Sequence, residues 1–210
     1  MHKILLADIG NTHFHIYDGQ KVEHLTYEDA IEKYSQSKLC YICVKHQLSD
    51  EIAGIKNWKN ISSLMSIEGE YETMGVDRKA LCLSHASGIF IDAGSAITVD
   101  VVKNGIYTGG YIFPGIKAMI KTYKEISPVL DSELDTKIEL HRLPLTTKEQ
   151  ISYGIIASIK VLIEKHSESK TLYFTGGDGK FLSTFFDDVI YDDTLVFRGM
   201  LKAIKDKKIC

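Results

Sequence analysis

One pattern in the chain occurs twice: an apolar run ends in an acidic residue and a small glycine turn, and a second strand follows at once. The first copy reads Asp8-Ile-Gly-Asn-Thr, and the second, 84 positions later, reads Asp92-Ala-Gly-Ser-Ala. Each copy continues into a further turn, Asp18-Gly19 or Asn104-Gly105, and then into a third strand. Repetition of a whole three-strand meander favours two similar lobes over one continuous sheet.

Helical and strand patterns alternate after each meander. Predicted helices cover residues 28–37, 48–58, 76–86, 114–126, 147–168 and 195–208. Predicted strands cover residues 39–45, 60–67 and 171–177. This alternation is typical of α/β sheets with crossover connections. We therefore predict an α/β fold with an N-terminal lobe over residues 1–86 and a C-terminal lobe over residues 87–210, facing a shared cleft.

Charge and hydropathy argue against two classes of partner. The net charge is -3, so the sequence lacks the basic footprint that binding to a phosphate backbone needs, and we expect no nucleic-acid partner. The apolar stretches stop well short of the roughly 20 residues that span a bilayer, and no signal-peptide cleavage pattern is visible. We expect no membrane partner and a cytoplasmic location, which the sparse set of four cysteines also suits.

The glycine turns have the chemistry of phosphate sites. Gly10 allows close backbone approach, exposed amides in a tight turn can cradle anionic oxygens, and Thr12 adds a hydroxyl. Asp8 would hold Mg²⁺, usually through water. A third turn, at residues 175–179, follows an apolar strand and precedes a helix, a place where nucleotides commonly bind. Any one turn alone also fits an ordinary hairpin, but the paired occurrence favours phosphate binding.

Acid–base chemistry has its best candidate in the segment that starts at Gly75. Asp77 lies near the N-terminus of a predicted helix, where the dipole favours the ionised carboxylate, and it could accept a hydroxyl proton during phosphoryl transfer. Arg78 could pair with a substrate carboxylate. The same two residues fit an ordinary helix N-terminal acid beside a surface arginine, and the sequence leaves both interpretations open.

Two further patterns have a simpler structural explanation. His13 and His15 share one face of a strand and could in principle hold a metal, but they also fit a polar strand face. Cys40 and Cys43 have CxxC spacing, yet they lie in an apolar run that lacks a second ligand pair. We interpret these residues as structural.

Taken together, the motifs resemble the type III pantothenate kinases of the acetate and sugar kinase/Hsp70/actin superfamily. The matching segments are DIGNT at 8–12, GVDR at 75–78, IDAGSAITVDVV at 91–102, GGYIFPGIKAM at 109–119, TKEQISYG at 147–154, TGG at 175–177 and DDTLVFRGM at 192–200. The resemblance implies duplicated ribonuclease H-like, or actin-like ATPase, lobes, each a mixed sheet flanked by helices. It also implies phosphorylation of the primary hydroxyl of pantothenate by ATP, the first step toward coenzyme A.

The same resemblance implies roles for single residues. Asp77 matches the general base. The residues implied for ATP and its phosphates are Asp8, Gly10, Asn11, Thr12 and Ser95. Ser95 stands where the family usually has threonine. The chemistry of the third glycine turn adds Gly176 and Gly177 to this set. The residues implied for pantothenate are Gly75, Val76, Asp77, Arg78 and Thr147, with Thr147 contributed across a homodimer interface near the substrate site.

The implied cofactors besides ATP are Mg²⁺, held by Asp8 through water, and a monovalent cation, K⁺ or NH₄⁺, held by Asp92. The family usually has an aromatic residue shortly before its GxDR motif, and whether Tyr71 takes that place is left open. Two alternatives remain: a kinase of the same fold acting on another small hydroxylated substrate such as a sugar, or a non-catalytic transcriptional accessory protein. The three carboxylates of Asp8, Asp77 and Asp92 favour catalysis.

Overall fold

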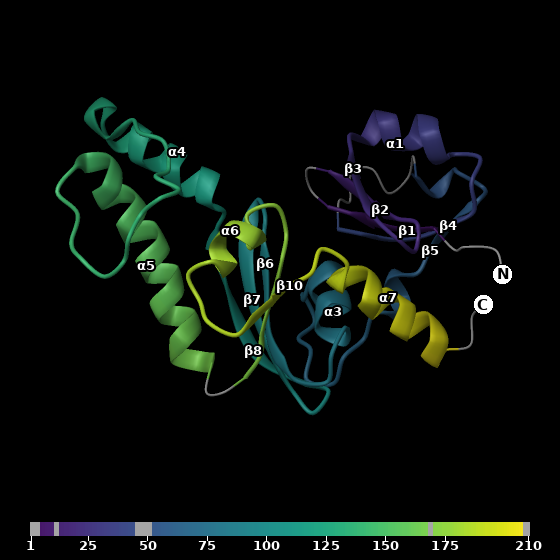
Figure 1. Ribbon diagram of the computed structural model, residues 1–210. Coiled ribbons are helices and arrows are strands. Elements are labelled where there is room, and N and C mark those ends of the chain that lie inside the picture. Colours follow the sequence, from purple (N-terminus) through teal and green to yellow (C-terminus); the bar gives the residue numbers. More distant parts are fainter. Residues whose placement is uncertain (1–4, 11–12, 45–51, 168–169, 208–210) are drawn as a thin grey trace. The chain divides into compact units, whose positions relative to one another are not determined.

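The computed structural model describes residues 5–10, 13–44, 52–167 and 170–207 (Figure 1). The chain forms two compact units. Unit 1 consists of Met1–Ser87, Asp100–Gly109 and Asp193–Cys210, and unit 2 consists of Gly88–Val99 and Gly110–Asp192. The predicted lobe boundary at residues 86 and 87 stays a prediction, because compact units follow contacts and need not coincide with duplicated lobes.

The first sheet contains five strands in the order β3-β2-β1-β4-β5. The strands are β1 Leu5–Ile9, β2 Phe14–Tyr17, β3 Val22–Leu25, β4 Leu39–Cys43 and β5 Trp58–Asn60. Short turns join β1, β2 and β3, so these strands run antiparallel, whereas β4 and β5 are parallel to their neighbours. Strand β4 is parallel to β1, and parallel strands cannot be joined by a tight hairpin. The connection from β3 to β4 is therefore longer and contains helix α1, Tyr27–Tyr34.

Local sequence explains α1 and the core beneath it. Thr26 caps the helix, since its hydroxyl accepts a hydrogen bond from the backbone N–H of Asp29 at 3.1 Å. The core cluster of this sheet includes Phe14 and Trp58, whose ring centroids are 5.6 Å apart. The indole N–H of Trp58 donates to the carbonyl of Tyr34 at 3.0 Å, which ties the end of α1 to β5.

Two helices of unit 1 pack backbone against backbone: α3, Val76–Leu83, and α7, Leu195–Asp206. The contact requires Gly199 of α7, because a Cβ atom there would lie 1.7 Å from the carbonyl oxygen of Ala80 in α3. Phe197, on the same helix, stacks on Tyr17 of β2 with ring centroids 5.3 Å apart. Helix α7 thereby holds α3 in a fixed place.

The predictions for residues 48–67 were partly wrong. Residues 45–51 lie outside the described chain; Ile52 and Ala53 are helical, but Trp58 already belongs to β5. The predicted strand over 60–67 is instead a 3₁₀ turn, η2, Ser62–Leu64. Asn60 causes the change, because its side-chain oxygen accepts from the backbone N–H of Ser62 at 2.8 Å and so ends the strand in a turn.

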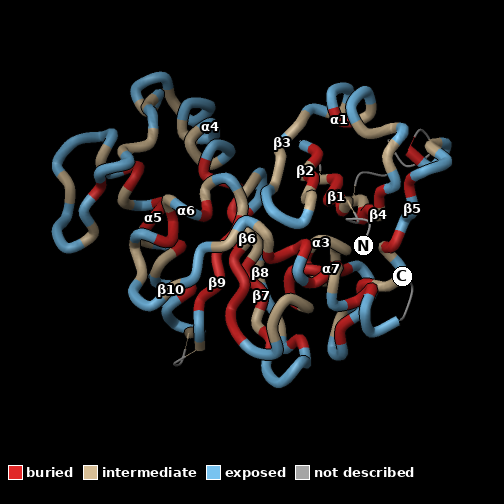
Figure 2. The backbone as a smooth tube through the Cα atoms, turned by 45° about the vertical axis from the view of Figure 1, so that its right-hand side comes forward, coloured by how far each residue is buried: buried red, intermediate tan, exposed pale blue. Residues whose placement is uncertain are grey.

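The second sheet has the order β10-β9-β6-β7-β8. Its strands are β6 Gly88–Ala93, β7 Ala96–Lys103, β8 Ile106–Pro114, β9 Leu172–Thr175 and β10 Val189–Tyr191. The order repeats that of the first sheet, with the third, second and first strands of a meander followed by two strands added on the far side of the first. Figure 2 shows β6 and β9 in the red of buried residues. Two mixed sheets of one topology confirm the predicted fold class.

The β7–β8 connection is the hairpin predicted at Asn104-Gly105, with φ of 53° and 81° as a two-residue turn of this kind requires. The remaining helices are α4 Ile116–Ile126, η3 Pro128–Leu130, α5 Thr147–Ser167 and α6 Gly179–Ser183. Thr146 and Glu149 form a capping box at the start of α5, which confirms the predicted long helix. Among the described residues, no helix is long and apolar enough to cross a membrane.

Candidate active site

Asp77 lies in the first turn of α3, directly after the N-cap residue Gly75 and the first helical residue, Val76. Its Oδ1 accepts the backbone N–H of Arg78 at 2.8 Å. The carboxylate packs so closely on Gly75 that a Cβ there would lie 2.5 Å from Oδ1. Burial raises the pKa of Asp77, and the neighbouring Arg78 opposes the rise. A carboxylate with a raised pKa is a better proton acceptor than an exposed one.

Arg78 is buried, with 7 % of its surface exposed, so the surface-arginine interpretation is wrong. Its Nε donates to Oδ2 of Asp100 at 3.0 Å and its Nη2 donates to Oδ1 at 2.5 Å. Asp100 comes from β7 and is completely buried. Burial lowers the pKa of Arg78, but the hydrogen bond and charge of Asp100 outweigh it, and the net pKa is raised. The guanidinium is therefore a permanent cation.

Two tyrosines complete the surroundings of Arg78. Nη1 donates to the hydroxyl of Tyr71 at 2.5 Å, and Nη2 lies 3.4 Å from the hydroxyl of Tyr107. The guanidinium also lies 5.8 Å from the centroid of the Tyr71 ring, a cation–π distance. Tyr71 is 41 % exposed, so it stands at the solvent end of this cluster. Tyr71 is thus an aromatic residue in contact with Arg78 of the GVDR segment.

The segment that contains Tyr71 is held from two sides. The carboxylate of Glu70 accepts from Lys79 of α3 at 2.9 Å and from the backbone N–H of Ile67 at 2.7 Å. On the other side, the backbone N–H of Tyr107 donates to the carbonyl of Glu68 at 2.8 Å. Gly69 has a φ of +84°, and a Cβ there would lie 2.4 Å from the carbonyl oxygen of Tyr107. Hydrogen bonds of the Glu70 side chain and of the backbone therefore hold the loop before α3 in place.

Strand β1 contributes Asp8 to unit 1, and the turn after it contributes Gly10. Asp8 is a buried residue of β1, opposite His15 of β2 and Ile42 of β4. The carbonyl of Gly10 accepts the hydroxyl of Tyr27 at 2.7 Å, and its N–H donates to the carbonyl of His13 at 3.1 Å. Asn11 and Thr12, which were predicted for the same loop, lie outside the described residues.

Three small-residue turns meet in unit 2. Gly176, with a φ of +86°, lies against the β6–β7 turn, because a Cβ there would be 2.4 Å from Oδ1 of Asp92. The backbone N–H of Asp178 donates to the carbonyl of Ala93 at 2.9 Å. On the other side, the N-cap of α4, Gly115, donates to the carbonyl of Ser95 at 3.1 Å. Asp92, Ser95 and Gly176 are therefore brought together, with the N-terminus of α4 beside them.

Sequence reasoning missed two of these participants. Asp100 had a usable signal, because an acidic residue inside the apolar run "AITVDVV" needs a buried partner. Gly115 also had one, since Pro114-Gly115 precedes a helix, and helix N-termini favour anions. Gly177 is the one predicted glycine of its turn with open space around its Cα.

Thr147 is the first residue of α5 and is exposed. Nearby in the chain, Leu143 and Leu145 are 77 % and 92 % exposed, and Val129 after α4 is also exposed. Two of these exposed apolar residues, Leu143 and Leu145, are therefore close to Thr147 in the chain. Thr147 and the α3 residues belong to different units of the chain.

The histidine and cysteine patterns form no metal centre among the described residues. Nδ1 of His15 and Nδ1 of His24 are 2.6 Å apart and share a hydrogen bond. Burial, followed by the charges of His24 and His13, lowers the pKa of His15 to about 4. Cys40 and Cys43 are half-buried residues of β4. The structural interpretation of these residues stays a prediction.

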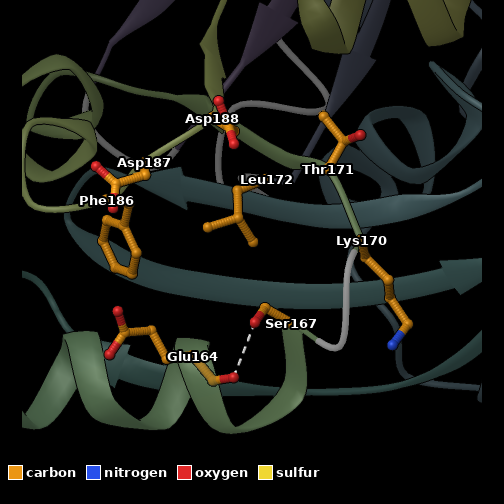
Figure 3. Close-up of a pocket in the computed structure, with 8 residues that line it drawn as sticks. All are labelled: Glu164, Ser167, Lys170, Thr171, Leu172, Phe186, Asp187 and Asp188. Atoms are coloured by element: carbon orange, nitrogen blue, oxygen red, sulfur yellow. Dashed lines mark hydrogen bonds between the residues drawn. The ribbon is translucent and has the colours of Figure 1, made fainter.

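A hollow in unit 2 has no part in the predicted chemistry. Figure 3 shows it at the C-terminal end of α5, where Ser167 donates to the carbonyl of Glu164. Its lining residues are Glu164, Ser167, Lys170, Thr171, Leu172, Phe186, Asp187 and Asp188. None of the residues predicted for ATP, cation or pantothenate is among them.

Comparisons with known proteins identify a family that this chain resembles over most of its length. The family model for type III pantothenate kinase matches residues 45–169. A type III pantothenate kinase from Campylobacter jejuni subsp. jejuni is 41 % identical over 203 residues, which is 97 % of each chain. A solved structure from Campylobacter jejuni, described as a conserved putative Baf family transcriptional activator, has a TM-score of 0.90 at 39 % identity and covers 98 % of this chain and 100 % of its own.

A more distant structure shows the fold alone. The activator of 2-hydroxyisocaproyl-CoA dehydratase from Clostridium difficile, solved with bound ADPNP, has a TM-score of 0.56 at 9 % identity. It covers 99 % of this chain and 97 % of its own. The two chains therefore share one fold over nearly their full length.

Proposed function

Because the chain belongs to the type III pantothenate kinase family, we propose that it transfers the γ-phosphoryl group of ATP to the primary hydroxyl of pantothenate. The product is 4'-phosphopantothenate, and the reaction is the first step of coenzyme A biosynthesis. The observation that carries the proposal is the cluster at the start of α3, where a half-buried carboxylate with a raised pKa lies next to a fixed guanidinium. Such a pair suits a substrate with a hydroxyl at one end and a carboxylate at the other.

In this reaction Asp77 accepts the proton of the attacking hydroxyl, and Arg78 binds the substrate carboxylate. Phosphoryl transfer through a loose transition state needs mainly positioning and charge compensation. Tyr71, which is exposed and accepts a hydrogen bond from Nη1, marks the side of Arg78 that a substrate approaches. Gly75 and Val76 contribute a backbone surface that lacks large side chains next to the base.

The glycine turns are proposed to hold ATP. In unit 1 the loop from Asp8 to Thr12 binds phosphate oxygens, and in unit 2 Ser95, Gly176 and Gly177 do so. Asp8, a hard oxygen ligand at the end of a strand, fits Mg²⁺ held through water. When bound, Mg²⁺ supplies positive charge that offsets the phosphate oxygens. A cytoplasmic location and the lack of a nucleic-acid partner remain predictions from the sequence.

Asp92 is proposed to hold a monovalent cation. Its carboxylate lies against Gly176 and next to the carbonyl of Ala93, so oxygen ligands of the kind that K⁺ prefers are gathered there. We expect kcat to fall several-fold when K⁺ is replaced by Na⁺ in the wild type. Asp92→Asn should lower activity and abolish the difference between the two cations. Initial rates in matched chloride salts measure both effects, and a wild type indifferent to the cation would contradict the assignment.

We further propose a homodimer in which Thr147 of one chain reaches the partner's substrate. The exposed Leu143 and Leu145, close to Thr147 in the chain, support it, because contact with a second chain would remove these large apolar side chains from water. Leu145→Lys should shift the molecular mass from dimer to monomer and lower activity, as measured by size-exclusion chromatography with light scattering. Ile190→Lys, at an exposed apolar residue of β10, is the control and should leave the mass unchanged. A wild-type monomer would contradict the proposal.

The test of the function is pantothenate-dependent ADP formation with ATP, Mg²⁺ and K⁺, together with mass-spectrometric detection of 4'-phosphopantothenate. Product from pantothenate and none from a panel of sugars supports the proposal. Phosphorylation of a sugar in preference to pantothenate would favour the alternative kinase. A folded protein that makes no product from any substrate would favour an accessory role, in line with the description of the Campylobacter jejuni structure.

A further inference from the structure

Asp100 is a charged residue in an apolar setting. It lies on β7, is completely buried, and uses both carboxylate oxygens to accept hydrogen bonds from Arg78. A buried ion pair is often no more stabilising than apolar side chains of similar volume, because both charges lose their hydration. Fold stability alone therefore explains this pair poorly, and a geometric role explains it better.

The hydrogen bonds to Arg78 fix the plane of its guanidinium. An arginine side chain has five N–H donors in a rigid fork. Asp100 takes one from Nε and one from Nη2, the hydroxyl of Tyr107 faces the other hydrogen of Nη2, and Tyr71 takes one from Nη1. Within the part of the chain that the structure describes, the second hydrogen of Nη1 is the donor left for a ligand. It lies at the end of the guanidinium marked by the half-exposed Tyr71.

Asp100 itself cannot touch a substrate, since it has no exposed surface. Any effect of Asp100 on the substrate must therefore pass through Arg78. The loop that carries Tyr71 is independently fixed by Glu70 and Lys79, so the acceptor at the other end of the guanidinium is also in a set place. Arg78 is thus held by Asp100 on its Nε and Nη2 side, while Tyr71 binds one of the two Nη1 hydrogens and the other has no acceptor among the described residues.

We infer that Asp100 is a positioning residue, which holds Arg78 so that Nη1 presents its free N–H to the carboxylate of the substrate. This inference rests on the proposed function, which supplies that carboxylate. A pre-oriented donor binds more tightly, because the side chain has less freedom to lose on binding. Asp100 should therefore act on substrate binding and leave ATP binding and the phosphoryl-transfer step largely unaffected.

The kinetic test uses Asp100→Asn, which keeps the shape and one carbonyl oxygen but loses the second charged acceptor. We expect the KM for pantothenate to rise about tenfold or more, with the KM for ATP within about twofold and kcat within a few-fold. The matched control is Cys82→Ala. Cys82 is equally buried on α3 and lies within electrostatic reach of both Asp100 and Arg78. It should lower thermal stability without changing the KM for pantothenate.

A second measurement reports on Arg78 without any substrate. The chain has three arginines, Arg78, Arg142 and Arg198, so the Nε–H signals of ¹⁵N-arginine-labelled protein are few enough to assign by substitution. In the wild type the Arg78 signal should exchange slowly with water. Arg142, which is highly exposed although paired with Glu139, should exchange quickly. In Asp100→Asn the protection of Arg78 should be lost, while Arg198 is unchanged.

The two measurements separate the possible failures. Loss of Arg78 protection together with a raised KM for pantothenate supports the inference. Retained protection, or lost protection with an unchanged KM, overturns it. If the wild type neither binds nor phosphorylates pantothenate, the proposed function has failed and the inference falls with it, even where Asp100 holds Arg78. If Asp100→Asn does not fold, Arg78→Lys keeps a charge beside Asp100 but lacks the planar fork, and a KM for pantothenate equal to that of the wild type would overturn the inference.

Discussion

Replacing Asp77 with asparagine should lower kcat about a thousand-fold, the scale typical of removing a positioned general base. The amide cannot accept the hydroxyl proton that the carboxylate takes up during phosphoryl transfer. The fold should survive, because the amide oxygen of asparagine can still accept the backbone N–H of Arg78, as Oδ1 of Asp77 does now. Steady-state kinetics measure the change, and circular dichroism with a thermal melt checks the fold.

A control for Asp77→Asn is Asp29→Asn. Asp29 is also an acidic residue in the first turn of a helix of unit 1, where its backbone N–H bonds to the cap residue Thr26. If the loss of activity came from a general weakening of helix N-termini, both variants would lose activity. We expect Asp29→Asn to keep wild-type kcat. Near-normal turnover of Asp77→Asn would remove Asp77 as the base.

The pH profile gives a separate check on the same carboxylate. A base works only when deprotonated, so activity should fall as the pH drops through the pKa of Asp77. Burial raises that pKa, so the acidic limb of kcat/KM should lie above the ordinary aspartate value of about 3.9. The residual activity of Asp77→Asn should lack this limb. A limb at or below the ordinary value would contradict a raised pKa of the catalytic carboxylate.

Much of the fold follows from patterns that are local in the sequence. The meander turns Asp18-Gly19 and Asn104-Gly105 set the strand order on one side of each sheet, and the duplicated order of both sheets follows from the 84-residue repeat. The strand expected over residues 60–67 failed because Ile61, Met65 and Ile67 are buried without belonging to a strand. The sequence predicts that these apolar side chains are buried. It does not predict the backbone path, which turns after β5 because the side chain of Asn60 accepts a hydrogen bond from the backbone N–H of Ser62.

In the candidate site, too, local features could be predicted from the sequence and long-range contacts could not. Gly75, Asp77 and Arg78 could be predicted as a group, because four successive residues at a helix start must lie together. The pairing of Arg78 with Asp100, 22 positions away, could not, because a buried charge finds its partner through tertiary packing. From the sequence, Arg78 could be either a surface residue or a residue that binds the substrate carboxylate. The described residues give it a buried acidic partner and leave one N–H of its guanidinium for a ligand.

Gly199→Ala should lower the free energy of unfolding by about 3 kcal/mol or more, because the new methyl group meets a backbone that cannot move aside alone. Its Cβ would lie 1.7 Å from the carbonyl oxygen of Ala80, well inside contact distance, so α7 and α3 would have to separate. Separation would open the contact that both helices use to exclude water. Chemical denaturation followed by circular dichroism measures the change.

The matched control for Gly199→Ala is Gly154→Ala on α5. That glycine is exposed within a helix, and a Cβ there would meet only the hydroxyl of Tyr123, at 3.8 Å. Alanine has the higher helix propensity, so Gly154→Ala should be neutral or stabilising by up to about 1 kcal/mol. Equal stability of the two variants would contradict the close packing of α3 on α7. Because α3 carries Asp77 and Arg78, Gly199→Ala protein that still folds should also lose activity, whereas Gly154→Ala should retain it.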